Sequence, residues 1–226
     1  ARLNAKSPKY SCKELLLFHY KYHLLIMPNI EFLLALITFY FVMYVTPGPN
    51  NSMVLASSLK FGFKKSIPVI LGITIGHIIQ LIIVCLGFGV IFKTYPEIQF
   101  LLKILCAAYM LYLSFKIIGS FSEVAASKLK PVRFYEAALF QIINPKAWTI
   151  SSMAASGFIS TEINLFSSIL VIASVALLVC PVSISPWAAF GAAIRKFVKD
   201  RKVKIIIEFV LATLLVLTAI LIVIQL

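Results

Sequence analysis

The stretch Thr46-Pro47-Gly48-Pro49-Asn50-Asn51 interrupts a long apolar run that covers residues 32–59. Each proline removes a backbone N–H group and clashes with the preceding turn, so a continuous helix cannot pass through. Gly48 is expected to supply the unusual dihedral angles of the break, and Asn50 to cap the helix that follows. Inside a hydrophobic span, freed backbone groups are tolerated only where protein or water satisfies them. Broken helices of this kind often build the binding sites of transporters.

The composition is that of an integral membrane protein. Of the 226 residues, 61% are hydrophobic and 13% are charged, and the mean hydropathy is +1.00. Soluble domains carry about 25% charged residues. The apolar runs reach the roughly 20 residues that a helical span needs, and they lack the alternation of barrel strands. The predicted fold class is therefore all-α, a polytopic membrane protein.

The apolar runs predict six transmembrane helices. The first is broken at residues 46–51, and the fourth is interrupted at Asn144-Pro145-Lys146. Gly72 and Gly76 form a G-x-x-x-G pair in the second, which lets another helix approach closely. The expected spans are residues 30–59, 66–92, 98–118, 134–159, 163–190 (with Pro181 and Pro186) and 205–226.

The basic residues predict the orientation. The formal net charge is +13, a value that can indicate nucleic acid binding. Here, however, twelve lysines and arginines lie in the loops after spans one, three and five, against Lys93 alone in the loops of the other side. This is the positive-inside pattern, so these three loops, including the connection 119–133, are expected in the cytoplasm and no nucleic acid partner is expected.

Residues 1–26 do not fit this orientation. They begin with Ala1 and carry five basic residues that would lie on the opposite side, and they lack the features of a signal peptide. We therefore expect residues 1–26 to be an N-terminal extension outside the core, and residues 27–226 to be the transmembrane domain.

The six spans divide into two halves, residues 27–118 and 134–226. In each half the first span carries a Pro/Asn interruption, and about 97 residues separate the two interruptions. Because each half has three spans, the second half must insert upside down relative to the first. Inverted repeats with paired broken helices predict a substrate site near the middle of the membrane.

The residues around the first break resemble a known signature. The element Thr46-Pro47-Gly48-Pro49-Asn50, followed by Gly62, Lys65, Gly72 and Gly76, resembles the signature of the LysE/RhtB family of amino acid exporters. The element Asn144-Pro145-Lys146-Ala147 is similar to that family's second motif. The resemblance covers residues 28–226. It implies a bacterial inner-membrane protein that exports amino acids or related small metabolites, driven by the proton gradient.

The two breaks supply the candidate substrate-binding residues. A half-helix N-terminus carries roughly half a positive charge and suits a carboxylate. The asparagines could bind substrate or only satisfy the broken backbone. A lysine near mid-span is costly, so Lys146 could attract a carboxylate, pair with carbonyls freed by Pro145, or extend toward an interface. The candidates are Pro47, Gly48, Pro49, Asn50, Asn51, Asn144, Pro145 and Lys146.

Two residues are candidates for proton coupling. His77 lies in span two near Gln80 and could relay protons, although a lone histidine among apolar residues is more often a hydrogen-bonded packing residue. Glu136 precedes the second break, but, like Glu31 and Glu208, it is near a span end, where solvated residues are expected. No span carries an aspartate for a basic side chain, which favours neutral substrates of the homoserine/threonine type.

The sequence gives little indication of redox, metal-binding or catalytic chemistry. The four cysteines form no C-x-x-C, and neither a disulfide, a metal site, a cofactor nor a catalytic residue is indicated. The expected partners are the amino acid substrate and the lipid bilayer, with a homodimer left open. Two alternatives to an exporter of amino acids remain: a transporter of another small solute or metal ion, and a non-transporting membrane protein.

Overall fold

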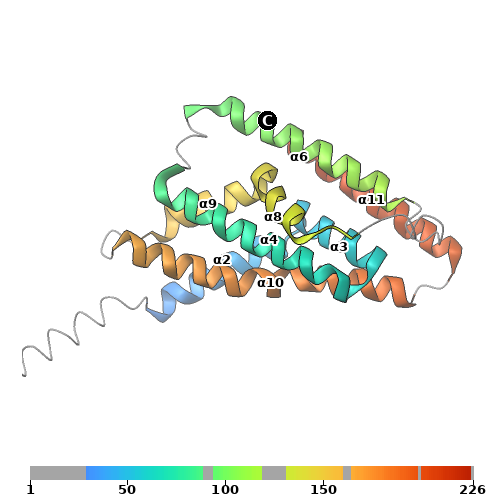
Figure 1. Ribbon diagram of the computed structural model, residues 1–226, viewed down its shortest axis with the longest axis horizontal. Helices are drawn as coiled ribbons and strands as arrows, with labels where there is room; N and C mark the ends of the chain where they lie inside the picture. The colour runs from blue at the N-terminus through green and yellow to red at the C-terminus, as the bar shows by residue number, and fades with distance from the viewer. Residues whose placement is uncertain (1–28, 89–93, 119–130, 160–163, 198–199, 225–226) are drawn as a thin grey trace, which may run out of the picture.

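The computed structural model describes residues 29–88, 94–118, 131–159, 164–197 and 200–224 (Figure 1). Within these ranges the chain is helical and contains no strand, which confirms the all-α prediction. The predicted N-terminal extension, residues 1–26, lies outside the described residues. The helices are α2 (Ile30–Val45), α3 (Pro49–Phe61), α4 (Phe63–Ile83), α6 (Pro96–Ile117), α8 (Phe134–Ile143), α9 (Pro145–Phe158), α10 (Leu165–Phe197) and α11 (Arg201–Ile224).

Both predicted interruptions are present. Helix α2 ends at Val45 and α3 begins at Pro49, with a bend of 57° between them. Helix α8 ends at Ile143 and α9 begins at Pro145, so a single residue separates them. Each second half-helix starts on a proline, whose fixed φ suits the first helical position and whose missing N–H would be unbonded there in any case.

Helix α10 passes through its two prolines without a break. It runs for 33 residues and contains Pro181 and Pro186, which corresponds to about 50 Å. The Ser185 hydroxyl donates to the Pro181 carbonyl within the same helix. This helix is long enough to cross the roughly 30 Å hydrocarbon core of a bilayer and to extend beyond it.

Helices α4 and α8 pack with almost no space between their backbones. A Cβ atom at Gly72 would collide with the Phe134 carbonyl, and one at Gly76 would lie 2.7 Å from the Ala138 Cα atom. Side chains larger than hydrogen would push α8 away, so these two glycines position the second broken helix against α4.

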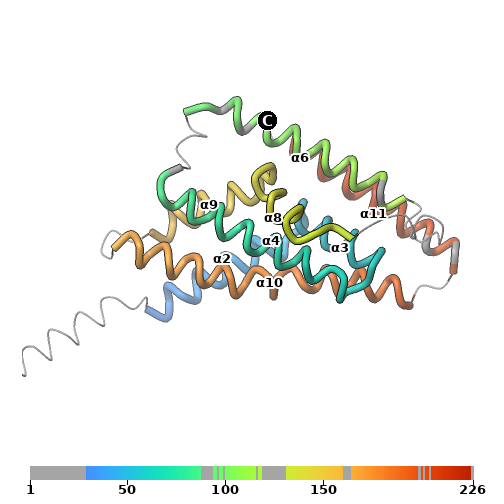
Figure 2. Tube along the Cα trace, viewed as in Figure 1, coloured from blue at the N-terminus to red at the C-terminus, as the bar shows by residue number. Residues whose placement is uncertain are grey.

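The remaining helices, α6, α10 and α11, belong to two packed groups. Helix α10 packs against α2, α3 and α4, while α6 and α11 pack against each other and contact the breaks from one side. Figures 1 and 2 show that α4 and α10 run in opposite directions along the bundle, as do α6 and α11. Each described helix of one predicted half packs against at least one helix of the other half.

Three of the described helices, and a fourth span if the bent pair α2–α3 counts as one, have the length and composition of membrane spans. The segments Phe63–Gly87, Leu165–Phe197 and Ile205–Ile224 are each long and apolar enough to cross a membrane, and the bent pair α2–α3 is a fourth candidate. Phe115, Phe166 and Leu178 are among the large apolar side chains that point outward, each more than 70% exposed. Such an apolar exterior suits lipid rather than water.

Candidate functional site

The second break is bonded to the first through Lys146. Its ammonium group donates to the Thr46 carbonyl at 2.8 Å, the Thr46 hydroxyl at 2.7 Å and the Pro47 carbonyl at 3.2 Å. About one hundred residues separate these partners in sequence, so the contact joins the two predicted halves. Of the alternatives considered for Lys146, pairing with carbonyls freed by Pro145 is wrong: the ammonium binds the carbonyls of the other break.

Asn51 satisfies the carbonyls at the end of α2. Its side-chain amide donates to the carbonyls of Tyr44 at 2.9 Å, Val45 at 3.4 Å and Thr46 at 2.7 Å. The last carbonyls of a helix have no partner within the helix, and at membrane depth they need one. Asn51 is only 2% exposed, so its amide serves as a buried cap for α2.

Both tryptophans of the chain donate to a carbonyl beside a break. The Trp187 indole N–H, from α10, binds the Val45 carbonyl at 3.1 Å, and the Trp148 indole N–H binds the Ile142 carbonyl at 2.8 Å. Each indole therefore supplies a donor to the C-terminal end of a half-helix.

A network of side-chain amides connects the breaks from within. Asn50 and Gln141 exchange two hydrogen bonds of 3.0 Å, and Asn144 donates to the same Asn50 oxygen at 3.0 Å. Gln80 of α4 donates to the Gln141 carbonyl at 2.9 Å. The network thus holds α3, α4, α8 and the start of α9 in one arrangement, and Gln141 lies at its centre, only 1% exposed.

The expected cap of α3 is wrong, whereas α9 has an asparagine cap that was not expected. Asn50 does not cap α3: the N-cap residue is Gly48, without a side-chain hydrogen bond, and the Asn50 side chain points into the amide network. Asn144 does cap α9, since its side-chain oxygen accepts from the Lys146 N–H at 3.1 Å. The reason is that α3 begins at Pro49, which moves the cap position to the residue before it.

Glycine at position 48 is needed for space, and the expected unusual dihedral angles are absent. Its φ of 172° is extended backbone that any residue can adopt. A Cβ atom there, however, would lie 2.9 Å from the Lys146 Cδ atom. Gly48 therefore lets the lysine stem lie against the backbone of the first break.

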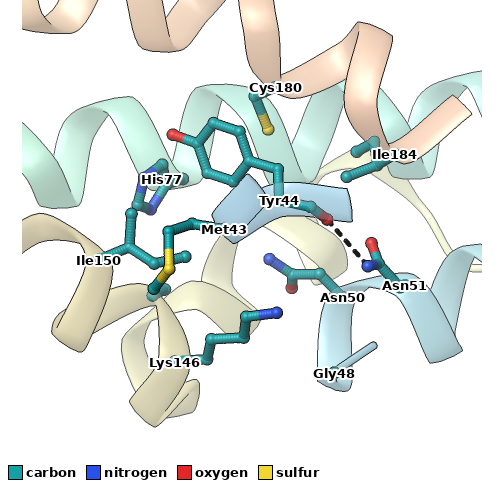
Figure 3. Close-up of a pocket in the computed structure, with 11 residues that line it drawn as sticks. Met43, Tyr44, Gly48, Asn50, Asn51, His77, Lys146, Ile150, Cys180 and Ile184 are labelled. Carbon is teal, nitrogen blue, oxygen red and sulfur yellow. Dashed lines mark hydrogen bonds between the residues drawn. The ribbon is translucent and has the colours of Figure 1, made fainter. Parts of the chain in front are cut away.

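A small cavity lies beside the breaks and is lined by residues of α2, α3, α4, α9 and α10 (Figure 3). Its volume of about 20 Å³ suffices for about one water molecule. Polar atoms of Tyr44, Asn51 and His77 face this region, and the Tyr44 hydroxyl, the Asn51 side-chain oxygen and both His77 nitrogens lack a hydrogen-bond partner within the described part of the chain. The lining residues are Met43, Tyr44, Gly48, Asn50, Asn51, His77, Lys146, Ala147, Ile150, Cys180 and Ile184.

A large pocket lies on the other side of Lys146, where α6 and α11 approach the breaks. Its volume is about 480 Å³, within the range of about 300–1,000 Å³ that is typical of small-molecule sites. Lys146 and Gly48 line both this pocket and the small cavity, so the lysine stem separates the two. The lining residues are Thr46, Pro47, Gly48, Pro49, Lys103, Pro145, Lys146, Thr149, Thr218, Leu221 and Ile222.

The two proton-coupling candidates lie in different places. His77 is 1% exposed, lines the small cavity and packs its ring edge-on against Tyr44, with centroids 5.4 Å apart. It interacts with Gln80 without making a well-formed hydrogen bond. Glu136 is exposed at the start of α8, where its carboxylate accepts from the Arg133 N–H at 2.7 Å. The structure therefore brings His77, but not Glu136, to the breaks.

Several site residues escaped the sequence reasoning. Gln141, Trp187 and Tyr44 were not singled out, although Gln141 stands in an apolar segment one turn before Asn144, a position that a search for buried polar side chains would have found. Glu208, expected to be solvated near a span end, is only 4% exposed. Among the described residues, no three His, Cys, Asp or Glu side chains gather as metal ligands would.

Comparison with known proteins finds a matching family model and relatives that share one name. The family model of the LysE type translocator matches residues 41–226. The cysteine/O-acetylserine efflux protein of Salmonella typhimurium is 32% identical over 123 residues, which cover 54% of this chain and 63% of the relative, less than two thirds of its length. The protein of the same name from Escherichia coli K12 is 27% identical over 177 residues, 77% of this chain and 90% of the relative. No solved structure matches.

The family match includes the first break, the second break and every helix from α3 to α11. It also includes Lys146 and the Thr46 and Pro47 oxygens that the lysine binds. By this match, the chain belongs to the LysE type translocator family.

Proposed function

We propose that this chain exports small neutral amino acids across the bacterial inner membrane by alternating access, with the substrate bound between the two helix breaks. The observation that carries the proposal is the bond between Lys146 and the Thr46 and Pro47 oxygens, at the wall of a pocket of about 480 Å³ that both breaks line. A translocator family and a pocket of this size favour transport of a small molecule over catalysis.

The arrangement of the helices supports two inverted repeats, residues 27–118 and 134–226, joined by the connection 119–133. Helix α4 of the first half packs on the broken helix α8–α9 of the second, and α10 of the second half packs on the broken helix α2–α3 of the first. The corresponding helices α4 and α10 run in opposite directions (Figure 1). This exchange of partners is what a two-fold axis in the membrane plane would produce, and it accommodates six spans.

The break residues Pro47, Gly48, Pro49, Asn50, Asn51, Asn144, Pro145 and Lys146 form the proposed substrate site. The first N–H groups of α3 are left without a side-chain cap, and the N-terminal end of a helix carries roughly half a positive charge. Together with Lys146, this end would attract the carboxylate of an amino acid.

The pocket also favours a neutral side chain. Neither the large pocket nor the small cavity is lined by an aspartate or a glutamate of the described residues, so a second ammonium group on the substrate would find no carboxylate partner. The relatives are named for efflux of cysteine and O-acetylserine. We therefore place cysteine and O-acetylserine beside homoserine and threonine as candidate substrates.

Proton antiport would supply the energy, and His77 is the better supported of the two candidates for its path. Its imidazole is buried at the small cavity, next to the break, and both its nitrogens lack partners in the described part of the chain. A role of Glu136 in proton coupling stays a prediction. A homodimer also stays a prediction, and a molar-mass measurement of the protein in detergent would test it. A loss of efflux when the pH gradient is collapsed would support proton coupling.

The described basic residues support the proposed orientation with the basic loops in the cytoplasm. Figure 1 shows the α3–α4 turn, the end of α10 and the start of α11 toward the same end of the bundle. Gly62, in that turn, lies so close to Arg195 that a Cβ atom would be 3.0 Å from its guanidinium. A concentration of positive charge at one end of a membrane bundle is the pattern that insertion produces.

The test is export from intact cells. Cells with and without the protein are loaded with dipeptides that release cysteine, threonine or homoserine inside, and the medium is assayed for each amino acid and for O-acetylserine. Asn50→Ala and Lys146→Ala should abolish efflux at unchanged membrane abundance. Gly157→Ala is the control, because its added Cβ atom would meet nothing within 4 Å.

The outcomes of the export experiment test the site assignment and the transport function separately. Normal efflux by both site variants would refute the site assignment. No export difference across the whole panel, with the protein verified in the membrane, would favour another solute, a metal ion or a non-transporting role.

A further inference from the structure

We infer that the Thr46 carbonyl, the Thr46 hydroxyl and the Pro47 carbonyl form the binding site for the α-ammonium group of the substrate, and that Lys146 occupies this ammonium site when no substrate is bound. The inference rests on the proposed function. It adds which charged group of the substrate each break recognises and why a zwitterion is selected over a simple amine.

The three oxygens match a primary ammonium group. Lys146 Nζ lies 2.8, 2.7 and 3.2 Å from them, and a primary ammonium has three N–H donors. Thr46 is the C-cap residue of α2 and Pro47 follows it in the break, so both carbonyls lie beside the negative end of the α2 dipole. No carboxylate of the described residues joins them, so the site holds its cation with backbone and hydroxyl oxygens alone. An amino acid carries the same chemical group as the lysine.

The two Thr46 oxygens are held in place without the lysine. The Thr46 N–H bonds to the Val42 carbonyl at 3.2 Å, and Asn51 donates to the Thr46 carbonyl at 2.7 Å. The Thr46 hydroxyl gives its proton to the Met43 carbonyl at 3.0 Å, so toward Lys146 it can only accept. A cation that replaces the lysine would find both Thr46 acceptors in the same positions, with the Pro47 carbonyl next to them in the chain.

The large pocket gives the substrate access to these oxygens and gives the lysine room to move. Thr46, Pro47 and Lys146 all line it. The lysine stem lies against Gly48, where there is no side chain to trap it, and its four-carbon chain is flexible. An amino acid in the pocket can therefore place its ammonium on the oxygens while Lys146 turns into the pocket.

The exchange explains selection of a zwitterion. The substrate ammonium takes over the hydrogen bonds of Lys146, and the released lysine ammonium pairs with the substrate carboxylate. An amine without a carboxylate would release a charge with no partner in a confined site, which is costly. An N-acylated amino acid lacks the cation that displaces the lysine. The empty carrier meanwhile keeps its two halves joined by the lysine.

The test is binding of small cations to the purified full chain in lipid nanodiscs, followed by thermal stability and tryptophan fluorescence. Lys146→Ala vacates the ammonium site, so it should bind ethylammonium at least about tenfold more tightly than the wild type, the factor expected from one hydrogen bond to a charged group. Tetramethylammonium, which has no N–H donor, should bind neither protein better. Ser156→Ala, on the same helix, is the matched control and should behave as the wild type.

Two further variants extend this test. Lys146→Met retains most of the lysine stem and should give the same gain if Lys146→Ala is not recovered folded. Adding Thr46→Val to Lys146→Ala removes one acceptor and should reduce ethylammonium affinity about tenfold. In the wild type an amino acid should bind more tightly than its decarboxylated amine or its N-acetyl form, and Lys146→Ala should reverse the preference between amino acid and amine.

The results distinguish the inference from the proposed function. A wild type that exports amino acids, with a Lys146→Ala variant that gains no ethylammonium binding, overturns the inference and leaves the proposed function in place. Equal stabilisation by ethylammonium and tetramethylammonium overturns it as well, as does an unchanged affinity after Thr46→Val. A wild type that neither exports nor binds an amino acid overturns the proposed function and the inference together.

Discussion

Asn51→Ala should lower the stability of the protein strongly, although Asn51 looks from the sequence like a second substrate ligand beside Asn50. The side-chain amide of Asn51 donates to three carbonyls at the end of α2. After the substitution, the Val45 carbonyl keeps its bond from Trp187 and the Thr46 carbonyl keeps its bond from Lys146. The buried Tyr44 carbonyl has no such second donor among the described residues and is left unsatisfied.

The magnitude follows from these bonds. A buried acceptor left without a donor costs about 1–3 kcal/mol, and a side-chain hydrogen bond within a membrane protein contributes about 0.6 kcal/mol on average. Together they predict a loss of about 1.6–3.6 kcal/mol. For a chain of this size, that corresponds to a fall in the unfolding midpoint of about 3–14 °C. Asn51→Asp, which places an oxygen against the same carbonyls, should be at least as destabilising.

The assay is thermal unfolding of the purified protein in detergent, with membrane abundance measured in parallel. Asn29→Ala is the control, because Asn29 caps the other end of the same helix through a single exposed bond to the Phe32 N–H. Loss of such a cap costs about 1 kcal/mol. An Asn51→Ala midpoint that equals the wild type, or that falls no further than that of Asn29→Ala, would refute the account of Asn51 as the buried cap of α2.

Three other substitutions test the framework of the site. Gly76→Leu should prevent α4 and α8 from packing, because even a Cβ atom would lie 2.7 Å from the Ala138 Cα atom; the expected result is aggregated protein on size-exclusion chromatography, while Gly157→Ala stays monodisperse. Gln141→Leu removes the centre of the amide network and should abolish efflux with a stability loss of about 1–3 kcal/mol; wild-type efflux would contradict a role in holding the breaks. Trp187→Phe removes the donor to Val45 and should cost about 0.5–1.5 kcal/mol in thermal unfolding, and an unchanged midpoint would show that Asn51 alone satisfies that carbonyl.

The location of both breaks could be predicted because it depends on local chemistry. Proline has no N–H wherever it stands, and Pro47, Pro49 and Pro145 end or begin helices in the structure as they do in the prediction. The cap of α3 could also have been predicted, since a proline favours the first helical position and thereby makes Gly48 the cap. The prediction failed there because it considered which residue makes a good cap and not where the helix starts.

The partners of the site residues could not be predicted from neighbours in sequence. Among the alternatives for Lys146, local reasoning offered only the carbonyls freed by Pro145 as partners within the protein, because those are nearest along the chain. In the structure the lysine reaches Thr46 and Pro47, since close packing of α4 and α8 at Gly72 and Gly76 brings the second break up to the first. The roles of Gln141 and Trp187 depend on the same approach of distant helices.

The sequence alone determined that this protein is helical, that it belongs in a membrane, and where two of its helices break. These properties follow from apolar content, proline and charge, which act on the chain within a few residues. The tertiary structure decided that Lys146 bonds across the two breaks, that Asn51 is a cap while Asn50 joins an amide network, and that a pocket opens beside the lysine. Those outcomes depend on which helices pack together, because a buried hydrogen bond forms only where packing places a donor against an acceptor.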